Sequence, residues 1–203
     1  YAVCSPSRAG LITGRYQNRF GYSRNILLTP KDSTMGLPLS EQTLPDVLKE
    51  ANYKTKAIGK WHLGAHESLV PQKRGFDEFY GFVIGGHRYF PEDLILNDLT
   101  EARSQWDGYL TKIFDNGKRV DISKYLTEEL SDNAVKFIDE NSKNPFFLYL
   151  SYNAPHTPLQ ATKKDLDRNM HIDGEKRRTY AAMVTSLDDG VGLILDKLEE
   201  KKI

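Results

Sequence analysis

The sequence predicts an α/β domain, in which a layered sheet is flanked by helices. Short apolar runs of strand length alternate along the chain with segments whose apolar residues have helical spacing. The densest apolar run, Phe146 to Tyr152, has the length of a buried strand, and residues 175–201 carry a long helical pattern. With 39% apolar residues in 203, the chain is large enough to bury a substantial core.

The first quarter of the chain predicts two helices joined by an irregular segment. Residues 4–13 are expected to be helical, with a proline tolerated in the first turn and Gly14 as the stop. Residues 15–42 show no clear period and predict an unusually long connection. Thr43, followed by an acid three positions later, is typical of a capping box and predicts a helix over 44–52.

A strand and a pocket-forming region are expected next. Tyr53 to Ile58 alternates weakly and predicts a strand that delivers the hexapeptide 59–64 at its end. Residues 65–108 are rich in Gly, His, Tyr, Asp and Pro, with only short strand candidates such as 79–84. We expect this region to shape a substrate pocket.

The last part of the chain repeats the helix and strand alternation. Helical spacing predicts a helix over 125–141, and the nearly continuous apolar run 145–150 predicts a strand covered on both faces. After a loop at 153–158, a long helix is expected over 175–201.

Composition excludes several classes of protein. The 28 basic and 28 acidic residues cancel, so no basic nucleic-acid surface is indicated, and no run of about 18 apolar residues predicts a membrane span. The chain opens at Tyr1 rather than Met, so we expect the authentic N-terminus, with any export signal, to lie upstream. The single cysteine, Cys4, excludes an internal disulfide framework and a cysteine-based zinc site.

Cys4 and Arg8 are the first candidate site residues. Cys4 lies at the start of the first predicted helix, where the helix dipole stabilises an anion, and Arg8 follows four residues later on the same face. The alternative is a buried small hydrophobic residue beside a surface charge. The cysteine phosphatase loop is excluded because it needs an arginine six positions after its cysteine, where this chain has Gly10.

Lys60 and His62 form a second candidate pair. On an extended segment, residues two apart point to the same side and Trp61 points away from them. Lysine stabilises developing negative charge, and histidine transfers protons near neutral pH. The alternative is a solvated lysine and a loop histidine.

His156 is the third candidate. It follows the apolar strand and lies between Pro155 and Pro158, at the end of a strand where open α/β sheets bind ligands. A rigid loop holding one imidazole suits general acid or base catalysis, although such a histidine is often structural.

The remaining titratable residues are weaker candidates. His66, His87 and His171 are interpreted as surface or pocket residues. Asp188 and Asp189 suggest a paired metal site, but adjacent residues of a helix face about 100° apart, so we expect a solvated helix face instead.

Two motifs resemble those of a known family. Residues 4–8 and 11–15 match the C-x-P-S-R…TGR signature of the type I sulfatases, and Gly59-Lys60-Trp61-His62-Leu63-Gly64 resembles their second signature. The Pro-His-x-Pro loop at His156 is also similar to the family. The resemblance implies an alkaline-phosphatase-like layered sheet, with residues 1–203 forming a partial catalytic domain that is incomplete at both ends.

The resemblance also implies the chemistry. Cys4 would be oxidised by a formylglycine-generating enzyme to formylglycine, whose hydrated aldehyde attacks the sulfur of a sulfate ester and contacts a calcium ion. Arg8 would hold the formylglycine hydroxyl and assist the metal site, and Lys60 would bind sulfate oxygens. His62 would act as the base and His156 would protonate the leaving group.

The same resemblance indicates what lies outside these residues. Family members take calcium ligands from an Asp pair before the cysteine motif and an Asp-Asn pair after the last helix, so Cys4 is the only metal contact expected here. Because Ca²⁺ usually takes ~6–8 oxygen ligands, we expect residues 1–203 alone to bind calcium poorly and to be inactive.

The substrate and location are expectations of the same kind. A sulfated small molecule or glycan is implied, and the aromatic and basic stretch from Arg74 to Phe90 favours a sulfated sugar. Family resemblance suggests the periplasm or export from the cell, with no nucleic-acid partner. Two alternatives stay open: a phosphonate or phosphodiester hydrolase of the same superfamily, and a non-catalytic fragment that binds sulfated glycans.

Overall fold

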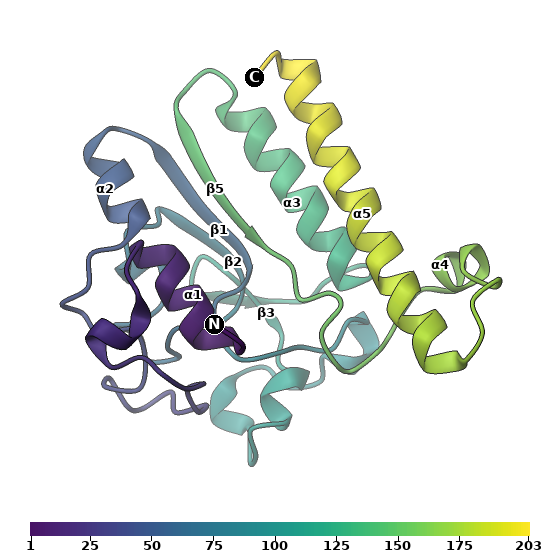
Figure 1. Cartoon of the computed structure of the whole chain (residues 1–203), viewed down its shortest axis with the longest axis horizontal. Coiled ribbons are helices and arrows are strands. Elements are labelled where there is room, and N and C mark those ends of the chain that lie inside the picture. The colour runs from purple at the N-terminus through teal and green to yellow at the C-terminus, as the bar shows by residue number, and fades with distance from the viewer.

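The computed structural model describes residues 1–203 and contains one mixed five-stranded sheet with helices on both faces (Figure 1). In space the strands follow the order β4-β3-β2-β1-β5, with β1 parallel to β2 and β5 and with β3 and β4 antiparallel. The strand bounds are β1 Lys54–Lys60, β2 Glu78–Phe82, β3 Ile113–Asp115, β4 Lys118–Val120 and β5 Phe146–Ser151. The predicted α/β class is confirmed.

Helices form the outer layers. In Figure 1, α1 and α2 lie on one side of the sheet, whereas α3 covers the other side and α5 packs against α3. The α-helices are α1 Cys4–Thr13, α2 Leu44–Glu50, α3 Leu126–Asn141, α4 Lys163–Arg168 and α5 Glu175–Lys201. Five short 3-10 helices are η1 Gln17–Phe20, η2 Pro71–Lys73, η3 Pro91–Asp93, η4 Leu99–Glu101 and η5 Asp107–Leu110. No helix in the structure has the length and the apolarity needed to cross a membrane.

Local signals placed the helix ends well. Gly14 ends α1 in the left-handed conformation, with φ of 63°. At α2, the Asp46 backbone N–H donates to Thr43 Oγ1 over 3.4 Å and the Thr43 backbone N–H donates to Asp46 Oδ2 over 3.0 Å. This reciprocal pair is the predicted capping box.

Two predictions about strands need correction. Strand β5 was expected to be covered on both faces, but it lies at the edge of the sheet, pairs only with β1, and is half-buried along its whole length. The hairpin of β3 and β4 was not predicted, although Asn116-Gly117 between two apolar segments is a strong hairpin signal. Helix α4 was also missed.

Within the stretch from Arg74 to Phe90, whose expected role in sugar binding stays a prediction, Arg74 has a structural role. Arg74 is buried and donates to the backbone carbonyls of Leu37, Pro38 and Glu41, at 3.1, 3.1 and 2.7 Å. It therefore holds the irregular segment 15–42 against the core.

The sequence analysis expected His87 at the surface or in a pocket, and this expectation is wrong because His87 lies in the core. Its side chain is 0% exposed, its ring lies 4.8 Å from that of Phe82, and Nε2 has no hydrogen-bond partner. Burial lowers the pKa of His87 to about 4. The neutral imidazole is thus part of the folded state.

This burial predicts a pH dependence of stability. Between about pH 4 and pH 6.5 the unfolded chain binds a proton at His87 that the folded chain does not, so stability falls as the pH is lowered through this range. In His87→Gln, we expect the slope of unfolding free energy against pH to decrease by up to about 1.4 kcal/mol per pH unit. Urea unfolding of the full-length protein at several pH values measures this slope, and His171→Gln, at an exposed position, is the matched control. Equal slopes for both variants would contradict the assignment.

Candidate active site

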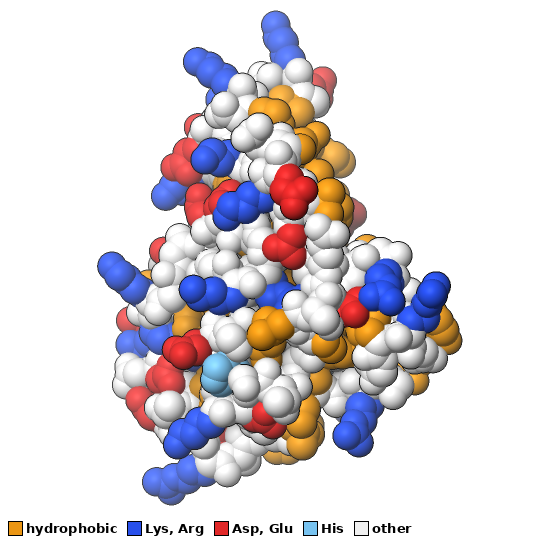
Figure 2. Space-filling model, turned by 90° about the vertical axis from the view of Figure 1, so that its left-hand side faces the viewer, with side chains coloured by type: hydrophobic (Ala, Val, Ile, Leu, Met, Phe, Trp, Pro, Cys, Tyr) orange, Lys and Arg blue, Asp and Glu red, His pale blue; other side chains and the backbone are white.

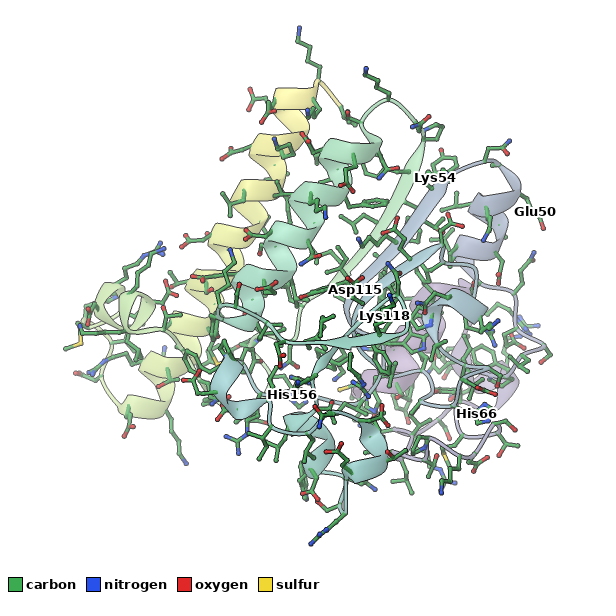
Figure 3. The ribbon with its side chains drawn as sticks, turned by 180° about the vertical axis from the view of Figure 1, so that it is seen from behind. Glu50, Lys54, His66, Asp115, Lys118 and His156 are labelled. Atoms are coloured by element: carbon green, nitrogen blue, oxygen red, sulfur yellow. The ribbon has the colours of Figure 1, made fainter.

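The predicted site residues meet at the carboxyl ends of β1 and β5. Lys60 ends β1, His62 follows two residues later, and His156 lies in the loop after β5. Figure 3 shows His156 and Lys54, the first residue of β1, at opposite ends of the sheet. Because β1 and β5 are parallel, their carboxyl ends deliver these side chains to the same edge.

Helix α1 is fastened to this edge by side chains of the cysteine motif. Ser5 Oγ donates to the backbone carbonyl of His62 over 2.7 Å, and Arg8 Nη1 donates to the carbonyl of Lys60 over 2.7 Å. Arg8 Nη1 also contacts the hydroxyls of Tyr149, at 3.3 Å, and of Ser151. The two sequence motifs are therefore in direct contact, and Cys4 at the start of α1 lies beside the end of β1.

The first position of the second motif requires glycine for a steric reason. Gly59 has φ of 97°, and a Cβ at this position would lie 2.1 Å from the backbone oxygen of Ser151. Only glycine allows this close approach of β1 to β5. The resulting geometry sets the direction in which the chain leaves β1.

A pocket of about 230 Å³ brings together three of the five predicted residues: Cys4, His62 and His156. Cys4 is partly exposed. The other lining residues are Asn25, Ile26, Leu27, Leu28, Ala65, Val83, Ile84, Gly85, Gln105, Trp106 and Tyr109. None of the fourteen is acidic, so no carboxylate in the lining would repel an anionic ligand.

Lys60 does not line the pocket but lies buried next to it. It is 3% exposed, and its Nζ donates to the backbone carbonyl of Gly85. Burial, and secondly the charge of Arg8, lower the pKa of Lys60, while an interaction with Cys4 opposes the shift. Lys60 and Arg8 thus place two cations beside Cys4 with no carboxylate to neutralise them.

His62 departs from the extended geometry expected of the Lys60–His62 pair. Its backbone is left-handed, with φ of 56°, so the chain turns at this residue. The ring is buried against Gly85, and Nδ1 has no hydrogen-bond partner. Burial, followed by the charges of Lys60 and Arg8, lowers the pKa of His62 to about 3. His62 is therefore neutral over the physiological range and able to accept a proton.

Trp61, as expected, points away into the core, where it packs edge-on against Phe76.

His156 is held by its own loop. Its Nδ1 lies 2.7 Å from the carbonyl oxygen of Thr157, and since a carbonyl only accepts, Nδ1 carries the hydrogen and Nε2 is free. The Tyr89 hydroxyl donates to the backbone carbonyl of His156 over 2.7 Å. Partial burial, and then the charges of Lys60 and Arg8, lower the pKa of His156. A bound anion would offset these two charges.

The aromatic residues of the pocket wall, Trp106 and Tyr109, were not predicted individually from the sequence. Trp106 is 74% exposed, and its ring lies 5.7 Å from the Tyr109 ring, nearly at right angles to it. Burial raises the pKa of Tyr109, and Cys4 contributes to the shift, so the phenol lies near the cysteine. The available signal in the sequence was the closely spaced aromatic pair. Residues 65–108 help to shape the pocket, as expected, through Ala65, Val83, Ile84, Gly85, Gln105 and Trp106.

The other weak candidates lie outside the pocket. His171 is exposed, and His66 is half-exposed with its Nδ1 2.8 Å from Ser68 Oγ. Asp188 is exposed, and Asp189 forms an ion pair with Arg168 of α4. The prediction of a solvated face for this acidic pair is consistent with these positions.

The side chains around the pocket lack the oxygen donors that calcium requires. No group of three or more His, Cys, Asp or Glu side chains is arranged to hold a metal ion, and the pocket lining offers no carboxylate oxygen. Calcium needs about six to eight oxygen ligands. Residues 1–203 therefore do not fit a calcium site by themselves.

Gly85 predicts a test of how His62 is placed. A Cβ on Gly85 would lie 2.9 Å from Cε1 and 3.1 Å from Nε2 of His62, so Gly85→Ala must displace the imidazole. We expect the kcat/KM of the full-length protein for the reaction at this pocket to fall about 10- to 100-fold, with an unchanged circular dichroism spectrum. Gly192→Ala on α5, where a Cβ meets nothing within 4 Å, is the matched control. Equal activities of the two variants would show that the position of His62 is unimportant.

Comparison with known proteins agrees with this fold and site. The family model described as Sulfatase matches residues 1–203, and the chain belongs to the sulfatase family. It is 34% identical to arylsulfatase J of Mus musculus over 93% of this chain and 31% of that protein. It is 35% identical to N-acetylgalactosamine-6-sulfatase of Homo sapiens over 98% of this chain and 38% of that protein.

Solved structures give the same result. The crystal structure of Ps i-CgsB in complex with k-i-k-neocarrahexaose is 41% identical, with a TM-score of 0.87, over 98% of this chain and 45% of that one. The putative sulfatase YidJ from Bacteroides fragilis, 21% identical with a TM-score of 0.76, supports the fold alone. The chain thus spans about a third of the length of these curated relatives and just under half of these solved chains.

Proposed function

We propose that the full-length protein is a sulfuric ester hydrolase that releases sulfate from a carbohydrate sulfate ester, with residues 1–203 as part of its catalytic domain. The observation that carries the proposal is the pocket itself. Cys4, His62 and His156 come from three distant parts of the chain and line one non-acidic pocket, with Lys60 buried alongside. The carbohydrate preference is supported by the names and bound ligand of the relatives.

Cys4 is the proposed precursor of formylglycine, which supplies the nucleophilic oxygen. The fit is supported by its partial exposure at the pocket and its position at the first residue of α1. Its neighbours then have defined tasks. The ammonium of Lys60 and the positive end of α1 stabilise the negative oxygens of the sulfate group. Arg8 adds a second positive charge and fixes α1 to the ends of β1 and β5.

The two histidines suit opposite proton transfers. His62 is neutral because burial and the charges of Lys60 and Arg8 hold its pKa at about 3, so its ring is the candidate that accepts a proton. His156 has its free Nε2 at the pocket, where a protonated ring would donate to the leaving oxygen. The negative charge of a bound sulfate ester would raise the pKa of His156 and favour that protonated form.

Sulfate release tests the proposal directly. The full-length protein, co-produced with a formylglycine-generating enzyme and supplied with calcium, is assayed on 4-nitrophenyl sulfate, N-acetylgalactosamine 6-sulfate and bis(4-nitrophenyl) phosphate. We expect sulfate release, with the phosphodiester hydrolysed far more slowly. Faster phosphodiester hydrolysis would favour the phosphodiesterase alternative, and sugar binding without turnover would favour a non-catalytic glycan-binding protein. Fractionation of the native host tests the proposed periplasmic or secreted location.

A further inference from the structure

A second hollow adjoins the active-site pocket. It measures about 700 Å³ and is lined by residues 28–32 and by residues 99–100 and 102–105. Leu28 and Gln105 line both hollows, so the two hollows are adjacent and share part of their walls. Whatever occupies the second hollow therefore lies next to a ligand at Cys4.

The lining of the second hollow carries a net positive charge, because it has two cationic side chains and one carboxylate. Lys31 and Arg103 line it, both are exposed, and neither forms an ion pair. The single acidic lining residue is Asp32, whose Oδ1 accepts hydrogen bonds from the backbone N–H and the hydroxyl of Thr34, at 2.8 and 2.6 Å. On the face of the molecule that Figure 2 shows, basic and acidic side chains are interspersed.

The remaining lining is polar rather than apolar. Thr29, Thr100, Ser104 and Gln105 offer hydroxyl and amide groups, which hydrogen-bond to sugar hydroxyls. The active-site side of the shared wall differs, since Trp106 and Tyr109 present ring surfaces there. One sugar ring can pack against the aromatic residues while its neighbour meets cations and hydroxyls.

We infer that the second hollow is a subsite for the adjacent sugar of a sulfated oligosaccharide, with an anionic group of that sugar bound between Lys31 and Arg103. The inference rests on the proposed function, because it assumes that the scissile sulfate lies at Cys4. It narrows the substrate class to oligosaccharides that carry more than one anionic group. A simple aryl sulfate would fill only the pocket at Cys4.

Binding measurements separate this inference from catalysis. Isothermal titration calorimetry uses the full-length protein with Cys4→Ser, which prevents turnover. The probes are k-i-k-neocarrahexaose, a hexasaccharide carrying N-acetylgalactosamine 6-sulfate, and inorganic sulfate. We expect at least one hexasaccharide to bind more tightly than sulfate, with an affinity that falls as salt is raised. In Lys31→Ala/Arg103→Ala, that hexasaccharide should lose about tenfold more affinity than inorganic sulfate does.

Matched variants sharpen the result. Lys118→Ala/Lys143→Ala removes the same charge from exposed positions that line neither hollow and form no ion pair, and it should bind the hexasaccharide as the parent does. Lys31→Arg/Arg103→Lys should restore most of the affinity. The inference is overturned if neither hexasaccharide binds more tightly than sulfate, or if both double alanine variants behave alike. Failure of sulfate release with normal hexasaccharide binding would instead contradict only the proposed function.

Discussion

Replacing Cys4 is expected to abolish sulfate release. In Cys4→Ala, kcat of the full-length protein should fall by at least about 10³-fold, because the precursor of the nucleophile is removed. The charges of Lys60 and Arg8 remain, so the variant tests the nucleophile alone. Cys4→Ser should be equally impaired if the reacting group is the oxidised residue and not a simple hydroxyl. Cys4 is partly exposed at the pocket, so neither change removes core packing.

The measurement has two parts. Mass spectrometry of the peptide that contains Cys4 should find formylglycine in the wild-type protein, and ion chromatography follows sulfate release by each variant. Thermal unfolding should give similar midpoints for all three proteins. A Cys4→Ala variant that retains more than a tenth of the wild-type rate would exclude position 4 as the source of the nucleophile.

Replacing Lys60 should separate catalysis from stability. Lys60→Met keeps most of the side-chain volume and removes the charge closest to Cys4, so kcat/KM should fall about 10²- to 10³-fold. Burial lowers the pKa of Lys60, which means that the folded protein holds this charge at a cost. We therefore expect the unfolding free energy of Lys60→Met to be equal to or higher than that of the wild type. Such a trade-off is typical of functional charges.

Lys56 of the same strand provides the matched control. It is also buried, but its Nζ pairs with Glu78 over 2.9 Å and lies 5.7 Å from the centre of the Phe137 ring, and it does not line the pocket. Lys56→Met should lose stability and keep its activity per folded molecule. If Lys60→Met instead lost stability and kept kcat/KM, Lys60 would be a structural residue.

The local sequence was sufficient to predict most of the longer helices and to identify the two motifs. Gly14, the Thr43 and Asp46 pair, and the apolar spacing over 175–201 act within a few residues of chain, so α1, α2 and α5 begin or end close to the predicted positions. The candidates Lys60, His62 and His156 were identified for the same reason. Their types and immediate neighbours are visible in the sequence.

Long-range contacts decided what the sequence did not reveal. The edge position of β5 depends on which strands pair, and the burial of His87 and Arg74 depends on segments far away in the chain. The environment of His62 likewise comes from Lys60, Arg8 and Gly85 together, which lower its pKa and confine its ring. Local periodicity carries no information about such pairings.

The sequence alone therefore determined helices α1, α2, α3 and α5, the α/β class and the identity of five candidate site residues, because these depend on short-range patterns. Only the tertiary structure showed that Cys4, His62 and His156 share a pocket with Lys60 beside it, and that a second hollow adjoins that pocket. The physical reason is that charge, burial and cavity shape arise where distant segments pack together, and their effects on pKa and binding exist only after that packing has formed.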